Sequence, residues 1–286
     1  MATPTVRKLQ LGNELRRLRE AAGRTPAEAA HELGSAPAKI SRLELGQSAV
    51  TVGDLKLLLE FYRADAEQVA WMVELSRDNR RRGRWSGDRA TFPEWFRSYV
   101  DLERDAEDIR IVQTEVVPGL LQTEAYMRVL YAAASPFEGP VDVDAAVRSR
   151  LERQEVLARS DAPTLSCVLS ESCIRRMVGG PKVMSEQLRH MAELAARPRV
   201  QIQMWPFDGE IATAAFAQRF TLLRIPAARA EQPFTFAYCE DLDDARYIDD
   251  APAVRVYEAE WGALQAAALG PAETRSRLRE LARQLT

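Results

Sequence analysis

The chain has 286 residues, of which 46% are hydrophobic and 28% are charged, and its formal net charge at pH 7 is −3. This is enough apolar material for about two hydrophobic cores. The sequence holds no run of about 18 apolar residues and no secretory signal pattern, so we expect a soluble cytoplasmic protein that does not enter a membrane.

Cysteine and histidine are too few and too scattered to predict a disulfide framework or a zinc site. The cysteines are Cys167, Cys173 and Cys239, and the histidines are His31 and His190. The cysteines include no closely spaced pair of the kind that binds zinc. We therefore expect no metal site and no other cofactor.

Residues 1–78 show the spacing of an all-α domain with five short helices. Leucines recur at helical intervals from Leu11 to Leu18, and Gly23 follows where a left-handed residue ends a helix. Thr25 is expected to cap the second helix, with Glu28 three residues later completing a capping box. The five helices are expected over residues 11–22, 26–33, 37–45, 51–62 and 65–76.

The third of these helices has an inward and an outward side. Ile40 and Leu43 fall on the inward side. The residues expected to point outward or to flank a groove are Ala36, Pro37, Ala38, Lys39, Ser41 and Arg42. A short helix that follows a tight turn in this way is the element that enters the DNA major groove in a helix-turn-helix. The alternative is a small helical packing module that binds no DNA.

Residues 9–76 resemble the DNA-binding domain of the Xre family, the lambda-repressor and Cro type of helix-turn-helix regulator. The segments that carry the resemblance are LRRLREAAG in the first helix, AAHELG in the second and ISRLELG at the end of the third. The resemblance implies a structural ion pair between Arg19 in the first helix and Glu44 at the end of the third.

The resemblance also implies which residues contact DNA. The residues expected to read bases are Pro37, Ala38, Lys39 and Arg42, with Ala36 and Ser41 beside them. The residues expected to contact phosphates are Arg24 and Thr25 at the start of the second helix and Gln47 and Ser48 after the third.

Two features depart from the Xre pattern. Pro26 stands where many members have a glutamine that can reach a phosphate, and Pro37 and Ala38 offer no side-chain hydrogen bonds. Readout would then rest on thymine-methyl contacts together with Lys39 and Arg42. We therefore expect modest base specificity for each half-site.

Charge is distributed unevenly along the chain. Residues 1–90 carry a net charge of +4, whereas the remainder carries −7. Within the basic part, residues 79–90 are expected to form an arginine-rich linker that contains Arg80, Arg81, Arg82, Arg84 and Arg89. Such a linker could follow DNA phosphates, or it could be a solvated connector or an ion-pair surface between domains.

Residues 91–286 are expected to form a second domain, of the α+β class. Thr123 is expected to cap one of its helices, and Asp142 to open a long one. Further helices are expected over residues 172–178, 182–196, 253–269 and 273–285. Strands are expected over residues 109–115, 164–169, 200–205, 219–225, 234–238 and 245–248. Most of these strands are separated by turns, which favours a mainly antiparallel sheet.

Nearly all of residues 90–286 resemble the C-terminal domain of actinobacterial Xre regulators, described as WhiJ-like or antitoxin-like. The matching segments are VVPGLLQTEAYMRVL, RSRLERQEVL, LSCVLSESCIRRMVGGPKVMSEQLRHM and RPRVQIQMWPFDG. The resemblance implies a transcriptional regulator whose gene neighbours one for a small partner protein, and hence a protein-sensing role.

A turn-to-helix element in this second domain is a candidate binding site for a ligand or partner. The residues expected to form the site are Leu120, Gln122, Tyr126, Arg150, Arg153 and Trp205. Gln154 and Glu171 could converge on the same place. The alternative explanation is structural, with a buried turn, an interior ion pair and a core aromatic residue.

Three functional classes follow from these features. The first is a homodimeric transcription regulator whose α+β domain senses a small protein or ligand. The second is an antitoxin-like module that mainly sequesters a small partner, and the third is a DNA-tethered enzyme. No nucleophile elbow or phosphate-binding loop is present, so we expect no enzymatic activity. A single helix-turn-helix reads only half a site, so we expect a homodimer formed through the second domain.

Overall fold

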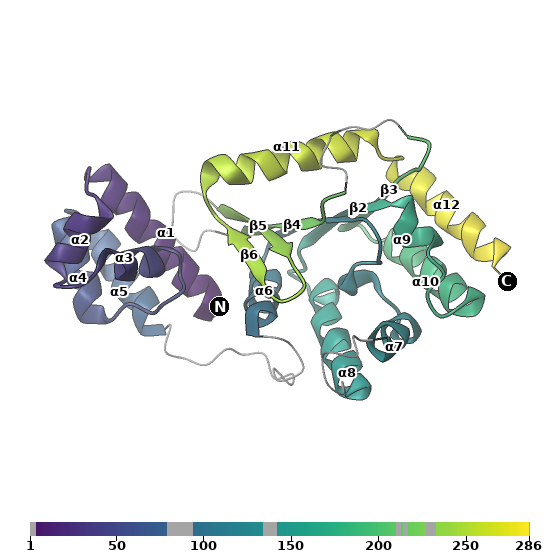
Figure 1. Cartoon of the computed structure of the whole chain (residues 1–286), viewed down its shortest axis with the longest axis horizontal. Helices are drawn as coiled ribbons and strands as arrows, with labels where there is room; N and C mark the ends of the chain where they lie inside the picture. Colours follow the sequence, from purple (N-terminus) through teal and green to yellow (C-terminus); the bar gives the residue numbers. More distant parts are fainter. Residues whose placement is uncertain are drawn as a thin grey trace. The chain divides into compact units, whose positions relative to one another are not determined.

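The computed structural model describes residues 4–78, 94–133, 142–209, 213, 217–226 and 233–285. The chain divides into an N-terminal helical unit and a C-terminal unit of helices and strands, with the main division after residue 85 (Figure 1). The linker predicted over residues 79–90 lies outside the described residues.

The N-terminal unit contains the five predicted helices. They are α1 (Pro4–Ala21), α2 (Pro26–Glu32), α3 (Pro37–Glu44), α4 (Val52–Phe61) and α5 (Ala66–Asp78). Helix α1 begins before the leucine pattern that predicted it. The core combines leucines with small residues, because Ala29 and Ala30 on α2 are fully buried and let neighbouring helices approach closely. Its largest fully buried side chains are Leu15, Ile40, Leu55, Leu58, Leu59 and Met72.

One glycine lets α1 lie directly against the end of α3. A Cβ atom on Gly12 would come within 2.5 Å of the Glu44 carbonyl oxygen and 2.6 Å of the Leu43 carbonyl oxygen. Both are backbone atoms, which cannot rotate away as the end of a side chain can. Only glycine therefore permits this approach of the two helices.

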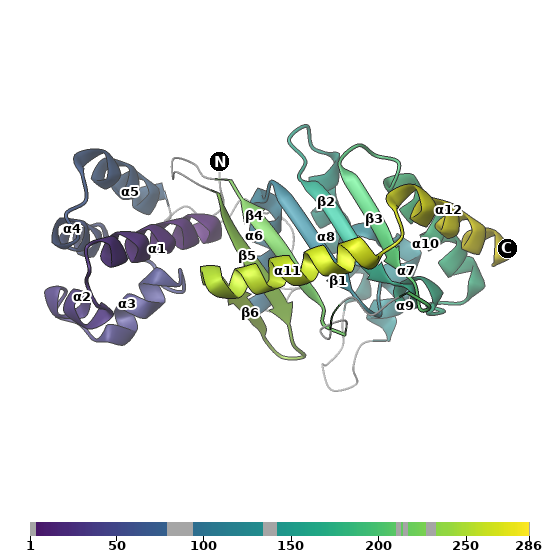
Figure 2. The ribbon, with the colours of Figure 1, turned by 90° about the horizontal axis from the view of Figure 1, so that it is seen from above.

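The C-terminal unit is built on one six-stranded sheet with the order β3-β2-β1-β4-β5-β6. The strands are β1 (Asp108–Gln113), β2 (Thr164–Ser170), β3 (Val200–Trp205), β4 (Phe220–Ile225), β5 (Phe234–Glu240) and β6 (Ala245–Ile248). Figure 2 shows them from above. The predicted α+β class is confirmed.

The sheet is mixed, because the three strands on one side of it are parallel. Strand β2 runs parallel to both β1 and β3, whereas the β1–β4, β4–β5 and β5–β6 pairs are antiparallel. Parallel neighbours require a crossover, which helices supply here. Between β1 and β2 the chain forms the 3-10 helix η2 (Gly119–Leu121), α7 (Glu124–Ala132), α8 (Val143–Gln154) and the 3-10 helix η3 (Glu155–Ala158). Between β2 and β3 it forms α9 (Glu171–Arg175) and α10 (Pro181–Leu194).

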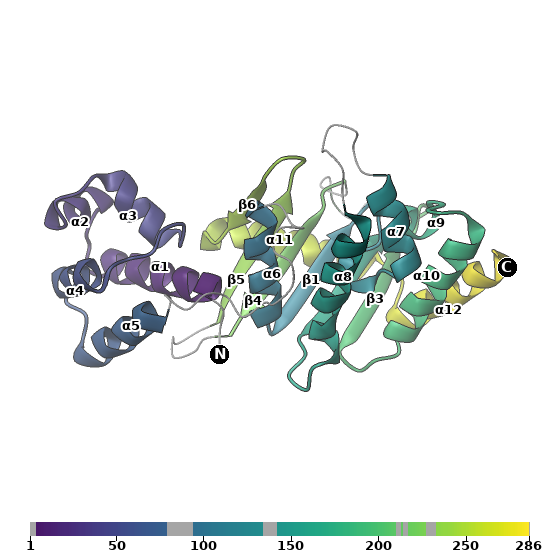
Figure 3. The ribbon, with the colours of Figure 1, turned by 90° about the horizontal axis from the view of Figure 1, so that it is seen from below.

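Helices cover both faces of this sheet. Helix α11 (Ala251–Ala267) crosses one face, where its Trp261 and Leu264 pack against Val112, Val168 and Leu222 (Figure 2). Helices α6 (Glu94–Asp105), α7 and α8 lie on the other face (Figure 3). The last helix, α12 (Pro271–Gln284), packs along α10. In the described part of the chain, no helix combines the length and the apolar character needed to cross a membrane.

Replacing Gly12 with alanine should destabilise the N-terminal unit. The added methyl group overlaps backbone atoms of α3, and overpacking of this kind costs about 2 kcal/mol. Calorimetric unfolding of the full chain should show the loss. The matched control is Gly53→Ala, whose new Cβ would meet only Thr51 Oγ1 at 3.8 Å. That variant should be neutral or gain about 0.5 kcal/mol, and equal effects of the two substitutions would contradict the steric argument.

Candidate nucleic-acid interface

The turn between α2 and α3 is fixed by local hydrogen bonds and by glycine. Thr25 Oγ1 accepts a hydrogen bond from the backbone N–H of Glu28 at 3.2 Å, and the Thr25 N–H donates to the Glu28 carboxylate at 2.8 Å. The predicted capping box is therefore confirmed. After α2, Gly34 adopts a φ of +57°, which favours glycine and turns the chain toward α3.

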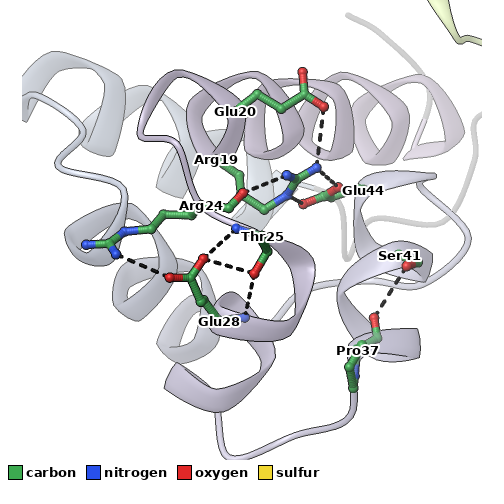
Figure 4. Close-up of polar contacts among 8 residues, drawn as sticks. All are labelled: Arg19, Glu20, Arg24, Thr25, Glu28, Pro37, Ser41 and Glu44. Atoms are coloured by element: carbon green, nitrogen blue, oxygen red, sulfur yellow. Dashed lines mark hydrogen bonds and ion pairs between the residues drawn. The ribbon is translucent and has the colours of Figure 1, made fainter.

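Helix α3 buries one side and exposes the other. Ile40 and Leu43 are buried in the core of the N-terminal unit. The exposed residues are Ala36, Pro37, Ala38, Ser41 and Arg42, and Lys39 is half-buried. The Ser41 hydroxyl donates back to the Pro37 carbonyl at 3.4 Å (Figure 4). Ala36 precedes the helix, and no side chain caps its first turn.

A buried ion pair fastens the end of α3 to α1. Arg19 Nε and Nη2 donate to the two carboxylate oxygens of Glu44 at 2.6 and 2.9 Å (Figure 4). Arg19 Nη1 donates to the Arg24 carbonyl at 2.9 Å. The hydrogen bond to Glu44 raises the pKa of Arg19, although burial opposes the shift. The ion pair implied by the Xre resemblance is confirmed.

Lys39, one of the predicted base readers, is engaged within the protein. Its Nζ donates to Asp54 Oδ2 at 2.8 Å, and the two side chains are 38% and 27% exposed. Asp54 lies in the first turn of α4, where its backbone N–H donates to the capping hydroxyl of Thr51. Sequence reasoning missed Asp54, because the pair depends on how α4 packs beside α3.

Arg42, unlike Lys39, is not held by a carboxylate of the described residues. It is exposed, and among the described residues its side chain forms no ion pair. Its carbonyl accepts hydrogen bonds from the N–H groups of Gln47 at 2.9 Å and Ser48 at 3.3 Å. Those two amides are thus used inside the protein, so any phosphate contact by Gln47 or Ser48 has to come from the side chains.

Arg24 and Thr25, at the start of α2, are predicted to contact phosphates. In the structure both side chains interact with the Glu28 carboxylate. Arg24 lies 3.5 Å from Glu28 in an ion pair, and its guanidinium lies 4.6 Å from the centre of the Phe61 ring. The Thr25 hydroxyl donates to Glu28 at 2.9 Å. The hydrogen bond from the Thr25 backbone lowers the pKa of Glu28.

In the C-terminal unit, the turn before α7 is held by the amide side chains of glutamines. Gln122 is 3% exposed, and its Nε2 donates to the Val117 carbonyl at 2.7 Å while its Oε1 accepts from Arg150 at 2.6 Å. Gln154 Nε2 donates to the Gly119 carbonyl at 2.7 Å. Leu120, in the same turn, is 1% exposed.

A glutamine from α10 completes the support of this turn. Gln187 is fully buried; it accepts from the Thr123 N–H at 2.8 Å and donates to the Leu121 carbonyl at 2.6 Å. The hydroxyl of Tyr126, also fully buried, accepts from the Val117 N–H at 3.3 Å. Sequence reasoning missed Gln187, which lies 64 residues beyond Thr123 in the chain.

The other residues of the predicted ligand site do not all converge on the turn. Arg153 reaches it, but its Nε and Nη2 donate to Glu103 at 2.5 and 2.6 Å. Burial lowers the pKa of Arg153, and the Glu103 carboxylate more than offsets this, so the net shift is upward. Trp205 packs instead with the cluster beneath α11, on the opposite face of the sheet from α7 and α8. Glu171 accepts from the backbone of Phe207 at 2.9 Å.

Comparison with protein families covers both units. Residues 96–280, more than half of the chain, match the family model described as a domain of unknown function, DUF5753. The chain belongs to the DUF5753 family. Residues 10–72 match the model of a helix-turn-helix domain, and this supports a DNA-binding regulator. No curated protein and no solved structure matches the chain.

The DUF5753 domain thus holds most of its predicted ligand-site residues inside its own hydrogen-bond network. Five of the six contribute to the turn or to the ion pair beside it, and Trp205 lies elsewhere. Within the described ranges, no group of three or more His, Cys, Asp or Glu side chains is placed to hold a metal ion. This burial favours the structural explanation of the turn.

Replacing Arg153 with methionine should destabilise the DUF5753 domain. Glu103 is 1% exposed, so removing its partner leaves a buried carboxylate without compensation, at a cost of about 3–5 kcal/mol. Urea unfolding should show this loss. The double variant Glu103→Leu with Arg153→Met removes both charges and should recover most of it. A fully stable Arg153→Met single variant would show that the pair has no structural role.

Proposed function

We propose that the chain is a sequence-specific, DNA-binding transcriptional regulator of the Xre type. In this proposal its DUF5753 domain senses a small partner protein or ligand, and no catalytic step is involved. The resemblance of residues 90–286 to WhiJ-like regulators supports the sensing role. The prediction that the protein is not an enzyme stays a prediction.

The observation that carries the DNA-binding part is the placement of Arg42 and Lys39 on α3. Arg42 is exposed on the side of the helix away from Ile40 and Leu43, and Lys39 lies half-buried at the border of the buried side. The Arg19–Glu44 pair fixes the end of that helix. An arginine at such a position can donate two hydrogen bonds to a guanine in the major groove. Pro37 and Ala38 add small apolar contacts of the kind that accept a thymine methyl group.

A homodimer is part of the proposal, because one helix-turn-helix covers only half of an operator. Its twofold axis would place two copies of α3 about one turn of DNA apart. Binding of a partner or ligand to the DUF5753 domain would then change how the two copies of α3 in the dimer bind DNA. Because Gln122 and Tyr126 are buried, the proposal places the sensing surface outside the turn of residues 118–123.

Substitution of the two cations on α3 should remove sequence-specific binding. Arg42→Ala and Lys39→Ala should each lower affinity for a duplex selected from a random pool by about tenfold to a hundredfold, since a base contact contributes about 1–3 kcal/mol. Fluorescence anisotropy with the full chain measures this. Lys56→Ala is the matched control, because Lys56 is two residues from Asp54 on α4 and points to the opposite side of that helix. Unchanged affinity in Arg42→Ala would refute the assignment of α3 as the reading helix.

Sedimentation should show a homodimer. The expected mass of the free protein is about twice the 32.1 kDa of one chain, and on a duplex with two half-sites one helical turn apart the mass of the duplex is added to that of two chains. The matched duplex has the second half-site displaced by about five base pairs, which places it on the other side of the helix and should weaken binding. A monomer both free and on DNA would exclude the dimeric regulator.

A further inference from the structure

The two cations that α3 offers to DNA are in different electrostatic states. Arg42 is exposed, and its side chain forms no ion pair with any described residue, whereas Lys39 Nζ donates to Asp54 at 2.8 Å. The cation nearer the start of the helix is therefore already partly neutralised before any DNA arrives.

Asp54 is held firmly enough to act as a fixed point. It occupies the third position of α4, its N–H donates to Thr51 Oγ1 at 3.1 Å, and the next residue, Leu55, is fully buried. A carboxylate in the first turn of a helix is also stabilised by the positive end of the helix dipole. The flexible side chain of Lys39 is thereby tied to a point whose position is set by the core.

This pairing changes what a lysine can do at a DNA surface. A free lysine is a mobile point charge that suits any nearby phosphate. The ammonium group has three donors, so one can remain on Asp54 while the others are available to an acceptor outside the protein. In the major groove, the strongest such acceptors are O6 and N7 of guanine.

We propose that Asp54 is a positioning residue that makes Lys39 a reader of guanine acceptors and not a phosphate contact. The carboxylate offsets the charge that would attract phosphate of any sequence and orients the remaining donors. The inference rests on the proposed function, since it requires α3 to enter the major groove. It adds a specificity determinant that does not itself touch a base.

The test compares Asp54→Asn with Glu60→Gln in the full chain. Both variants remove one negative charge from α4, but Glu60 is exposed near the other end of that helix, roughly 9 Å farther along its axis. The probes are a duplex selected by the wild-type protein from a random pool, copies with each guanine replaced in turn, and a scrambled duplex. Fluorescence anisotropy is recorded at KCl concentrations from about 50 to about 300 mM.

Asp54→Asn should bind the scrambled duplex more tightly and steepen the dependence of log Kd on log salt by up to about 0.9, the value for one more phosphate. Its discrimination against one particular guanine replacement should fall by about tenfold. Glu60→Gln should change none of these quantities comparably, and Asp54→Glu, which keeps a carboxylate, should restore most of the discrimination. Lys39→Ala should lower scrambled-duplex affinity more in the Asp54→Asn background than in the wild type.

Two results would overturn the inference while leaving the proposed function in place. One is identical behaviour of Asp54→Asn and Glu60→Gln, and another is a loss of affinity for every duplex in Asp54→Asn while its thermal unfolding stays that of the wild type. If Asp54→Asn does not fold, Asp54→Ser takes its place under the same criteria. Failure of the wild-type protein to select any sequence refutes the proposed function itself, and the inference with it.

Discussion

The N-terminal unit depends on the contact that joins the end of α3 to α1. Two elements make it: the bidentate ion pair of Arg19 with Glu44 and the glycine at position 12, where the helices meet backbone to backbone. A buried ion pair contributes little net stability, but it is intolerant of other geometries because each charge needs its partner. The contact therefore specifies the direction of the helix that is offered to DNA more than it strengthens the fold.

In the DUF5753 domain, polar side chains fix the position of a turn, as the Arg19–Glu44 pair fixes the end of a helix in the N-terminal unit. Gln122 lies in the turn itself, Gln154 on α8 and Gln187 on α10, and each binds backbone groups of the segment before α7. A turn buried in this way would otherwise carry unpaired peptide groups. The polar side chains that first suggested a ligand site are thus what allows an irregular segment to lie inside the domain.

Local chemistry could be predicted from the sequence, whereas contacts between distant elements could not. The caps at Thr25, Thr123 and Asp142 follow from short-range patterns, and all three side chains accept the expected backbone hydrogen bond. The helices between the first three strands were also predicted. The expectation of a mainly antiparallel sheet nevertheless followed the turns between the later strands, and the parallel pairing of β2 with β1 and β3 was not predicted. The Arg19–Glu44 pair was available only through a family resemblance, and the Lys39–Asp54 pair required the packing of α4.

The start of α3 differs from those of the helices around it. Thr25 and Thr51 satisfy the first amides of α2 and α4 with their own hydroxyls, whereas Ala36 supplies no such group to α3. Pro37 has no N–H and the Lys39 N–H donates to the Ala36 carbonyl at 2.9 Å, so in this first turn it is the Ala38 N–H that no described group accepts, at the positive end of the helix dipole. An oxygen of a nucleic acid could accept a hydrogen bond from this end of the helix. The hydrogen bond that the free protein lacks would then stabilise the complex.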